Sequence, residues 1–195
     1  MRAEAPETMP DFMINLADPD SISVFESDRA VTYFCNQIHN AAGNRLFEEM
    51  KRLSKKNIGK NLKVCLHHSP DALFHDMIIL EHKNNYFRPH KHLNKGETIH
   101  LIEGEIAVLV FDTDGGILSA CRLNKINPIS RVEEGCYHFV TPISDIVIYH
   151  ESKPGPFLGN NDSFFADWAP VPEDKKSIKV FVEQQLKYFD KDISA

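Results

Sequence analysis

HKHLNKGE, residues 90–97, places two histidines, a turn and a carboxylate in one short run. Side chains alternate between the two faces of a strand, so His90 and His92 point the same way, about 6.6 Å apart along the chain. The turn at residues 94–96 reverses the chain direction, which lets Glu97 return on the neighbouring strand. The run therefore predicts two imidazoles and one carboxylate converging inside a β-structure. An exposed histidine pair on an edge strand is the alternative.

A second run, EGCYH at residues 134–138, predicts a further ligand. Gly135 supplies a turn just before a β-like run, which holds His138 at the start of a strand. Imidazoles at such spacings can meet one ion at the roughly 2.0–2.1 Å typical of nitrogen–metal bonds, and histidines combined with one carboxylate form a common metal-binding face. We therefore expect one divalent ion, with zinc, iron, manganese and nickel as candidates. The expected ligands are His90, His92, Glu97 and His138.

Outward from these runs, short strands separated by turns fill most of the chain. Strands are predicted at residues 77–80, 86–92, 97–102, 106–111, 117–123, 138–141 and 146–151, with hairpin turns at 103–104 and 114–116. Strands spaced this closely, with no helices between them, predict an antiparallel sandwich or barrel.

The two ends of the chain differ from this β-rich middle. Residues 1–20 are polar, contain three prolines and predict a loose arm, and short β-like pieces follow at 22–25 and 31–35. Apolar residues at helical spacing predict an amphipathic helix from residue 46 to about 56 and a terminal helix at 177–189. We therefore divide the chain into an N-terminal extension at 1–60, a barrel at 61–172 and a C-terminal tail or helix at 173–195.

Composition limits the classes of partner. The 195 residues carry a net charge of −6 and no long basic run, which argues against a nucleic-acid binder. No apolar stretch approaches the roughly 20 residues of a membrane-spanning helix. Residues 1–13 contain three acidic residues and lack the apolar core of a secretory signal. The four cysteines lie far apart without metal-binding spacing, so we expect reduced thiols in a cytoplasmic protein.

The two runs resemble the two sequence motifs of the cupin superfamily, although Glu133 replaces the usual proline of the second motif. More narrowly, the chain resembles the WbuC-type cupin-fold metalloproteins over about residues 44–172. The resemblance implies a mainly β fold, the cupin double-stranded β-helix or jelly-roll barrel, with a bound divalent metal. It also implies a frequent setting among genes for surface-polysaccharide synthesis, but no settled reaction. The matching residues are VCLH (64–67), HDM (75–77), YFRPHKH (86–92), residues 97–104, VFD (110–112), DG (114–115), Glu151, GPF (155–157) and WAP (168–170).

Four residues near these motifs are candidates for catalysis or substrate binding. Tyr86 and Arg88 share strand parity with His90, so both are expected at the barrel mouth, Tyr86 as a catalytic group and Arg88 as a ligand for phosphate or carboxylate. A plain ion pair on the rim is the alternative for Arg88. Glu151 is expected to act as an acid or base, or else to cap the turn at 154–156. Trp168 is expected to stack on a sugar, or else to anchor its loop to the barrel.

Three further residues lie near the predicted site without being expected as ligands. His67 and His75 precede the metal motif and are expected to support the ligands or to fill the core. Cys136 shares strand parity with His138 and could supply a thiolate, although the cupin pattern does not require one.

This site permits three functions. The first is a metal-dependent enzyme that isomerises or epimerises a sugar or sugar nucleotide in surface-polysaccharide synthesis, with the ion polarising an oxygen while a nearby base moves a proton. The second is an iron-dependent dioxygenase, because three histidines and one glutamate also suit oxygen activation. The third is a non-catalytic module that binds a small molecule through its metal. The β-like pieces at 22–35 lack a partner of their own, which predicts a homodimer.

Overall fold

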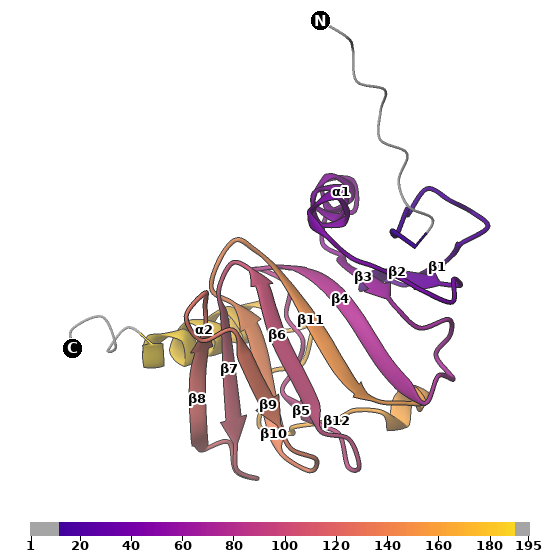
Figure 1. The fold of residues 1–195 in the computed structure, drawn as a ribbon. Coiled ribbons are helices and arrows are strands. Elements are labelled where there is room, and N and C mark those ends of the chain that lie inside the picture. The colour runs from indigo at the N-terminus through magenta and orange to yellow at the C-terminus, as the bar shows by residue number, and fades with distance from the viewer. Residues whose placement is uncertain (1–11, 190–195) are drawn as a thin grey trace, which may run out of the picture.

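The protein consists of two facing β-sheets with one α-helix packed on the outside of each (Figure 1). This computed structural model describes residues 12–189. Residues 1–11 of the expected arm and residues 190–195 of the expected C-terminal tail lie outside that range.

The seven-stranded sheet has the order β1 (Ile22–Glu26), β2 (Ala30–Cys35), β3 (Asn61–Cys65), β4 (Phe74–His82), β11 (Ile146–Pro154), β6 (Glu97–Glu103) and β9 (Ile129–Val132). The five-stranded sheet has the order β12 (Phe164–Phe165), β5 (His90–Lys91), β10 (Tyr137–Pro142), β7 (Ile106–Phe111) and β8 (Ile117–Leu123). The helices are α1 (Asn44–Ser54), the 3-10 turn η1 (Gly159–Asn161) and α2 (Lys175–Leu186). Among these strands β2 and β3 run parallel, and the other pairs are antiparallel.

Side-chain alternation along each strand separates the barrel interior from the outer layers. On β11, Val147 and Tyr149 point between the sheets, whereas Ile148 points out toward α1. On β10, Val140 packs between the sheets and Phe139 packs outside against α2. The chain therefore has one core inside the barrel and one under each helix.

The two helices are placed by apolar faces of the kind the sequence predicted. Leu46 and Met50 of α1 are buried against the outer face of the seven-stranded sheet. Phe181 of α2 packs on the five-stranded sheet, and the Asp174 side chain caps this helix by accepting a hydrogen bond from Ser177 N at 3.0 Å. Removing these apolar faces from water stabilises the packing of both helices on the barrel.

The hairpin predicted at residues 103–104 joins β6 to β7. Gly104 has a φ of 86°, a left-handed conformation that suits glycine. A Cβ atom there would also lie 2.8 Å from the Ile146 oxygen, so the turn needs glycine for space as well. Gly135, before His138, has a φ of 74°, as its predicted turn requires.

Several expectations about the chain ends are wrong. Ile14 and Leu16 fall in the expected loose arm, yet they are only 4% and 8% exposed and join the core under α1. The β-like pieces at 22–35 have partners within the chain, because β1 pairs with β2 and β2 pairs in parallel with β3. The division at residues 60 and 172 stays a prediction, and strands on both sides of residue 60 share one sheet.

The mainly β, double-sheet jelly-roll barrel predicted from the sequence is confirmed. Three of its strands, β3, β9 and β12, were not expected from the pattern, and the strand expected at 86–92 is confined to His90–Lys91. Within residues 12–189, neither α-helix is long and apolar enough to cross a lipid bilayer.

Candidate metal centre

Three histidines come together at one end of the barrel. His90 on β5 directly faces His138 on β10 in the antiparallel ladder, and His92 follows two residues after His90. One ring nitrogen of each lies within 4.8 Å of the others. The three residues are 8%, 2% and 2% exposed in the order His90, His92 and His138, so water has little access to the cluster.

Backbone carbonyls orient the imidazoles of His90 and His138. His90 Nδ1 lies 3.2 Å from the Arg88 oxygen, and His138 Nδ1 lies 3.0 Å from the Cys136 oxygen. A carbonyl can only accept, so Nδ1 carries the proton and donates it, which leaves the lone pair on Nε2. Such an outer hydrogen bond is the usual device that aims a metal-binding histidine.

His92 is oriented in the same way by the segment that follows β11. Its Nδ1 donates to the backbone oxygen of Asp162. Lys95 Nζ donates to the Asp162 carboxylate and to the Pro156 oxygen, and the same carboxylate accepts from Leu158 N at 3.1 Å. Burial alone would raise the pKa of Asp162, but the hydrogen bond from Lys95 and its positive charge outweigh burial and lower it. This buried ion pair therefore holds the segment against His92.

Glu97 begins β6 and reaches two of the three rings. It is 3% exposed. Its Oε1 atom lies 3.0 Å from His138 Nε2, and its Oε2 atom lies 3.4 Å from His92 Nε2. The turn at 94–96 thus returns the carboxylate to the histidines, as the spacing predicted.

The donor set fits a divalent ion. His138 Nε2 is buried without a hydrogen bond, and the Glu97 oxygen 3.0 Å from it is an acceptor like the nitrogen itself. A buried nitrogen lone pair without a donor is costly unless a cation meets it. Three inward Nε2 atoms and one carboxylate are ligands that zinc, iron, manganese and nickel all accept, so the set does not select the metal.

Lys153 is a charged residue of this site that the sequence reasoning missed. Its Nζ lies 3.4 Å from His92 Nε2, 3.5 Å from Glu97 Oε2 and 2.9 Å from Glu151 Oε1. Its side chain is 14% exposed. The signal was present in the alternation along β11, because a strand that turns Tyr149 and Glu151 inward also turns Lys153 inward.

The opposite charges of the buried carboxylates and of Lys153 stabilise one another. Burial alone would raise the pKa of Glu97, but its interactions with His138 and with the Lys153 ammonium hold it well below its ordinary value. Burial alone would lower the pKa of Lys153, but the Glu151 and Glu97 carboxylates raise it. Both groups are therefore charged inside the barrel at neutral pH.

Glu151 lies inside the barrel beside Lys153 rather than at the 154–156 turn. Its side chain is 13% exposed, and its salt bridge to Lys153 connects it to the histidine cluster. This position is compatible with the predicted acid or base role, which stays a prediction.

Tyr86 does not lie beside the histidines. Its hydroxyl donates to the Pro170 oxygen at 3.0 Å, and its ring packs near Phe139 and Phe181 on the outer side of the five-stranded sheet. Burial raises the pKa of Tyr86 to about 12. The parity argument that placed Tyr86 at the barrel mouth is wrong. Residues 83–89 do not form a strand, so side chains there do not alternate between two faces.

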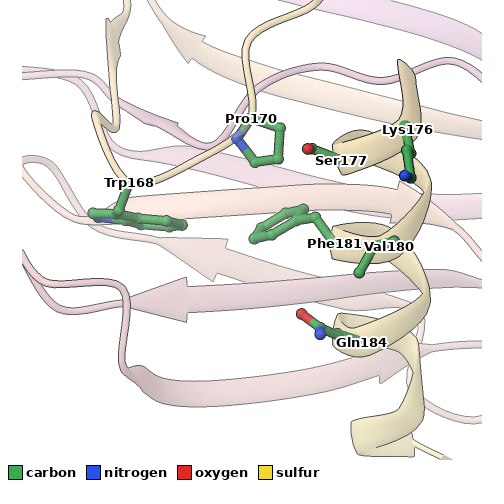
Figure 2. Close-up of a pocket in the computed structure, with 7 residues that line it drawn as sticks. All are labelled: Trp168, Pro170, Lys176, Ser177, Val180, Phe181 and Gln184. Atoms are coloured by element: carbon green, nitrogen blue, oxygen red, sulfur yellow. The ribbon is translucent and has the colours of Figure 1, made fainter. Parts of the chain in front are cut away.

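Trp168 also packs on the outer side of the five-stranded sheet. Its ring lies 5.0 Å from that of Phe111 and 6.3 Å from that of Phe181, measured between centroids. Trp168 and Phe181 both line a surface cavity of about 420 Å³ beside α2. Figure 2 shows their rings turned toward each other. Tyr137 precedes His138 on β10, so the two side chains point to opposite faces of the sheet. On the outer face, the Tyr137 ring contacts the Trp168 indole. The loop-anchoring alternative therefore describes Trp168 better than sugar stacking at the metal.

Arg88 contributes its backbone oxygen to the site, whereas its side chain has no partner in the described part of the chain that explains its position. Its oxygen orients His90, as described above. Its guanidinium Nε is buried without a hydrogen bond, and among residues 12–189 no ion pair engages the group. The rim ion pair expected as the alternative is therefore not formed within the described chain, and substrate binding by Arg88 stays a prediction.

Two exposed aromatic rings mark the side on which the cluster approaches the surface. The rings of Phe87 and Phe165 are centred 4.7 Å and 6.2 Å from the His90 ring. Both residues are 39% exposed, so one layer of side chains separates His90 from solvent.

His67 and His75 form a separate stacked pair, with ring centroids 4.3 Å apart and an angle of 7° between the rings. His67 Nδ1 accepts from Asp76 N at 3.2 Å, and His75 Nε2 donates to the Pro70 oxygen at 3.1 Å. Burial, and secondarily the neighbouring His75, lowers the pKa of His67 to about 4. None of these contacts reaches a proposed ligand, so the pair matches the expected core-filling alternative rather than support of the ligands.

One family model matches the chain, a domain of unknown function (DUF6016), over residues 42–123. The match includes His90, His92 and Glu97 but ends before His138. Its description does not name the WbuC family, so that narrower resemblance stays a prediction. No curated protein matches the chain at a significant level.

Solved structures with similar strand arrangements come from proteins of different kinds. An oxalate decarboxylase of Lactobacillus farciminis is 15% identical with a TM-score of 0.39, covering 48% of this chain and 26% of that one. An L-ribose isomerase of Cellulomonas parahominis is 16% identical with a TM-score of 0.42, covering 49% and 59%. An uncharacterized Klebsiella pneumoniae protein with a double-stranded β-helix domain is 16% identical with a TM-score of 0.42, covering 55% and 80%. This chain thus spans less than two thirds of the decarboxylase and of the isomerase, and likenesses this distant carry nothing about its activity.

Proposed function

We propose that the protein is a metal-dependent enzyme that acts on a small oxygen-rich molecule, a sugar or sugar nucleotide, by isomerisation-type proton transfer. The observation that carries the metal site is the clustering of three histidines, whose Nδ1 atoms donate to carbonyls and leave the lone pairs on Nε2. Glu97 lies beside two of these Nε2 atoms, those of His92 and His138. The sugar class and the setting in surface-polysaccharide synthesis rest on the WbuC resemblance.

The residues around the ligands divide the chemical work. His90, His92, Glu97 and His138 would hold the ion, which when bound supplies a positive centre that polarises a substrate oxygen. We assign the uptake and return of a proton to Glu151, and its position inside the barrel, 2.9 Å from Lys153 Nζ, supports this role. The segment carrying Asp162 keeps the His92 ring in place.

Metal analysis of the purified protein tests the proposal. Wild-type protein should carry one divalent ion per chain, and His92→Ala should lose it while the barrel stays folded, because apolar burial supplies most of its stability. His100→Ala is the matched control, since His100 lies exposed on β6. Full metal retention in His92→Ala would falsify the site.

The identity of the metal and the activity of the same purified protein distinguish the alternative functions. The set of three histidines and one glutamate favours oxygen activation as well as proton transfer, so iron with oxygen uptake would indicate a dioxygenase. Zinc or manganese with turnover of a sugar nucleotide supports the isomerase. Ligand binding without turnover indicates a binding module.

We also propose a homodimer, on different grounds from the unpaired strands expected from the sequence. β1 is an edge of the seven-stranded sheet, and Val24 and Phe25 on it are 60% and 63% exposed. Exposed apolar edge strands favour pairing with a second chain.

A further inference from the structure

Lys153 places an ammonium group directly beside the proposed metal ligands. Its Nζ lies 3.4 Å from His92 Nε2 and 3.5 Å from Glu97 Oε2, two atoms that would face the ion. The expected ligand set has no need of a cation at this position. A buried lysine next to a divalent ion would be repelled by it, so its presence calls for a negative group that offsets the repulsion.

The charged groups that are ion-paired around the proposed ligands can be counted. Glu97 and Glu151 carry one negative charge each and Lys153 carries one positive charge, while the Lys95–Asp162 ion pair is neutral as a unit. These groups leave one net negative charge, which a divalent ion would turn into one net positive charge. The loaded site would therefore lack one negative charge.

Metal binding would also release a hydrogen-bond donor. Lys153 now donates to His92 Nε2. A lone pair that binds an ion cannot accept a hydrogen bond as well, so His92 Nε2 would no longer accept from Lys153 once the ion is bound. Glu151 satisfies one of the three ammonium protons, at 2.9 Å. At least one proton of Lys153 is then free for a new acceptor within the barrel.

We propose that the site takes a ligand with a carboxylate, and that Lys153 is the residue that selects this anionic group by donating to one of its oxygens. The inference rests on the proposed metal site and adds the substrate class to it. A single carboxylate restores neutrality, and its second oxygen can approach the ion. A neutral diol of similar size supplies oxygens but no charge.

Cobalt(II)-loaded protein tests the proposal through its visible absorption, without any need for activity. Acetate is the anionic probe and ethylene glycol the neutral one. In wild-type protein, acetate should change the cobalt spectrum to saturation, and ethylene glycol should not at the same concentration. Lys153→Met should take up cobalt and bind acetate roughly ten- to a hundred-fold more weakly, the effect of losing one charge-assisted hydrogen bond.

Two further variants guard against a structural explanation. Lys91→Met is the matched control, because Lys91 lies on β5 beside the ligands but turns to the other face, 4.5 Å from the centroid of the Tyr137 ring. It should bind acetate like the wild type. Lys153→Arg keeps the charge, so acetate binding should be weakened less than in Lys153→Met, and it serves in its place if that variant does not fold.

The outcomes separate the two proposals. A wild-type chain that takes up no cobalt overturns the metal site and this inference with it. A cobalt-loaded wild type that ignores acetate, or a cobalt-loaded Lys153→Met that binds acetate as the wild type does, overturns only the role of Lys153.

Discussion

His90 and His138 face each other directly in the β5–β10 ladder, which sets two imidazoles side by side with ring centroids 4.4 Å apart. Antiparallel pairing holds both backbones, and each ring is further tied to a carbonyl two residues before it. The two proposed ligands are therefore fixed by the sheet itself, before any ion binds.

Removing the metal from wild-type protein should lower its melting temperature. An ion that binds only the folded chain, present at 100 times its Kd, adds about 2.7 kcal/mol of stability. His138→Ala lacks one ligand, so a chelator should leave its melting temperature unchanged. Thermal unfolding with and without EDTA measures both, and His100→Ala should respond like the wild type. An unchanged wild-type melting temperature after metal removal would contradict the prediction.

Glu81 should make stability depend on pH. It is 4% exposed and accepts a hydrogen bond from the Tyr149 hydroxyl at 3.1 Å. Burial raises its pKa from 4.5 to about 7. The unfolded chain loses this proton near the lower value and the folded chain near the higher one, so stability present below pH 4.5 is lost as the pH rises toward 7. The loss is on the order of 3 kcal/mol.

Urea unfolding across this pH range tests the Glu81 prediction. Glu81→Gln cannot ionise, so its free energy of unfolding should fall less between these pH values than that of the wild type. Glu134→Gln, at an exposed position, is the control and should keep the wild-type slope. Parallel pH profiles for wild type and Glu81→Gln would refute the assignment.

Breaking the buried Lys95–Asp162 pair should cost more stability than breaking an ion pair on the surface. Both side chains are at most 8% exposed, so removing one partner leaves a buried charge unpaired. Asp162→Ala should therefore destabilise the protein by about 3–5 kcal/mol. Adding Lys95→Met to this variant should recover part of the loss. Urea unfolding of the wild type, Asp162→Ala, Lys95→Met and the double variant gives the coupling energy between the two residues. Additive effects on the free energy of unfolding would show that the residues act independently.

The homodimer is tested by molecular mass. Light scattering at micromolar concentration should give twice the mass of the chain, and Phe25→Lys on the exposed edge of β1 should give a monomer, because an inserted charge blocks edge pairing. Ile58→Lys, at an exposed position outside the strands, is the control. A monomeric wild type would remove the proposal.

Most of the clustering of the proposed metal ligands could be predicted because it depends on a local relationship. His90, His92 and Glu97 are connected by one turn, and alternation along a strand is a property of the backbone alone. The turns at Gly104 and Gly135 could also be predicted locally, because glycine readily adopts positive φ. The barrel followed from short strands at regular intervals.

Other features depended on contacts between distant parts of the chain. Tyr86 was misplaced because alternation does not continue through the irregular residues 83–89. Ile14 and Leu16 looked like a loose arm because their burial partners lie on α1 and the outer face of the seven-stranded sheet. Asp162 reaches His92 across 70 positions of sequence, a contact that no local pattern announces.

By itself, the sequence determined a β-barrel with four residues at metal-ligand spacing, because period-two patterns and turn residues act over a few positions. Alternation along β11 turns Lys153 inward, but only the tertiary structure decided that it lies charged beside these four residues. A lysine is stable in a barrel only when carboxylates surround it, and these come from a neighbouring position on β11 and from β6. Strand pairing brings the two carboxylates to one ammonium group, and that charge balance is settled only when the sheets close.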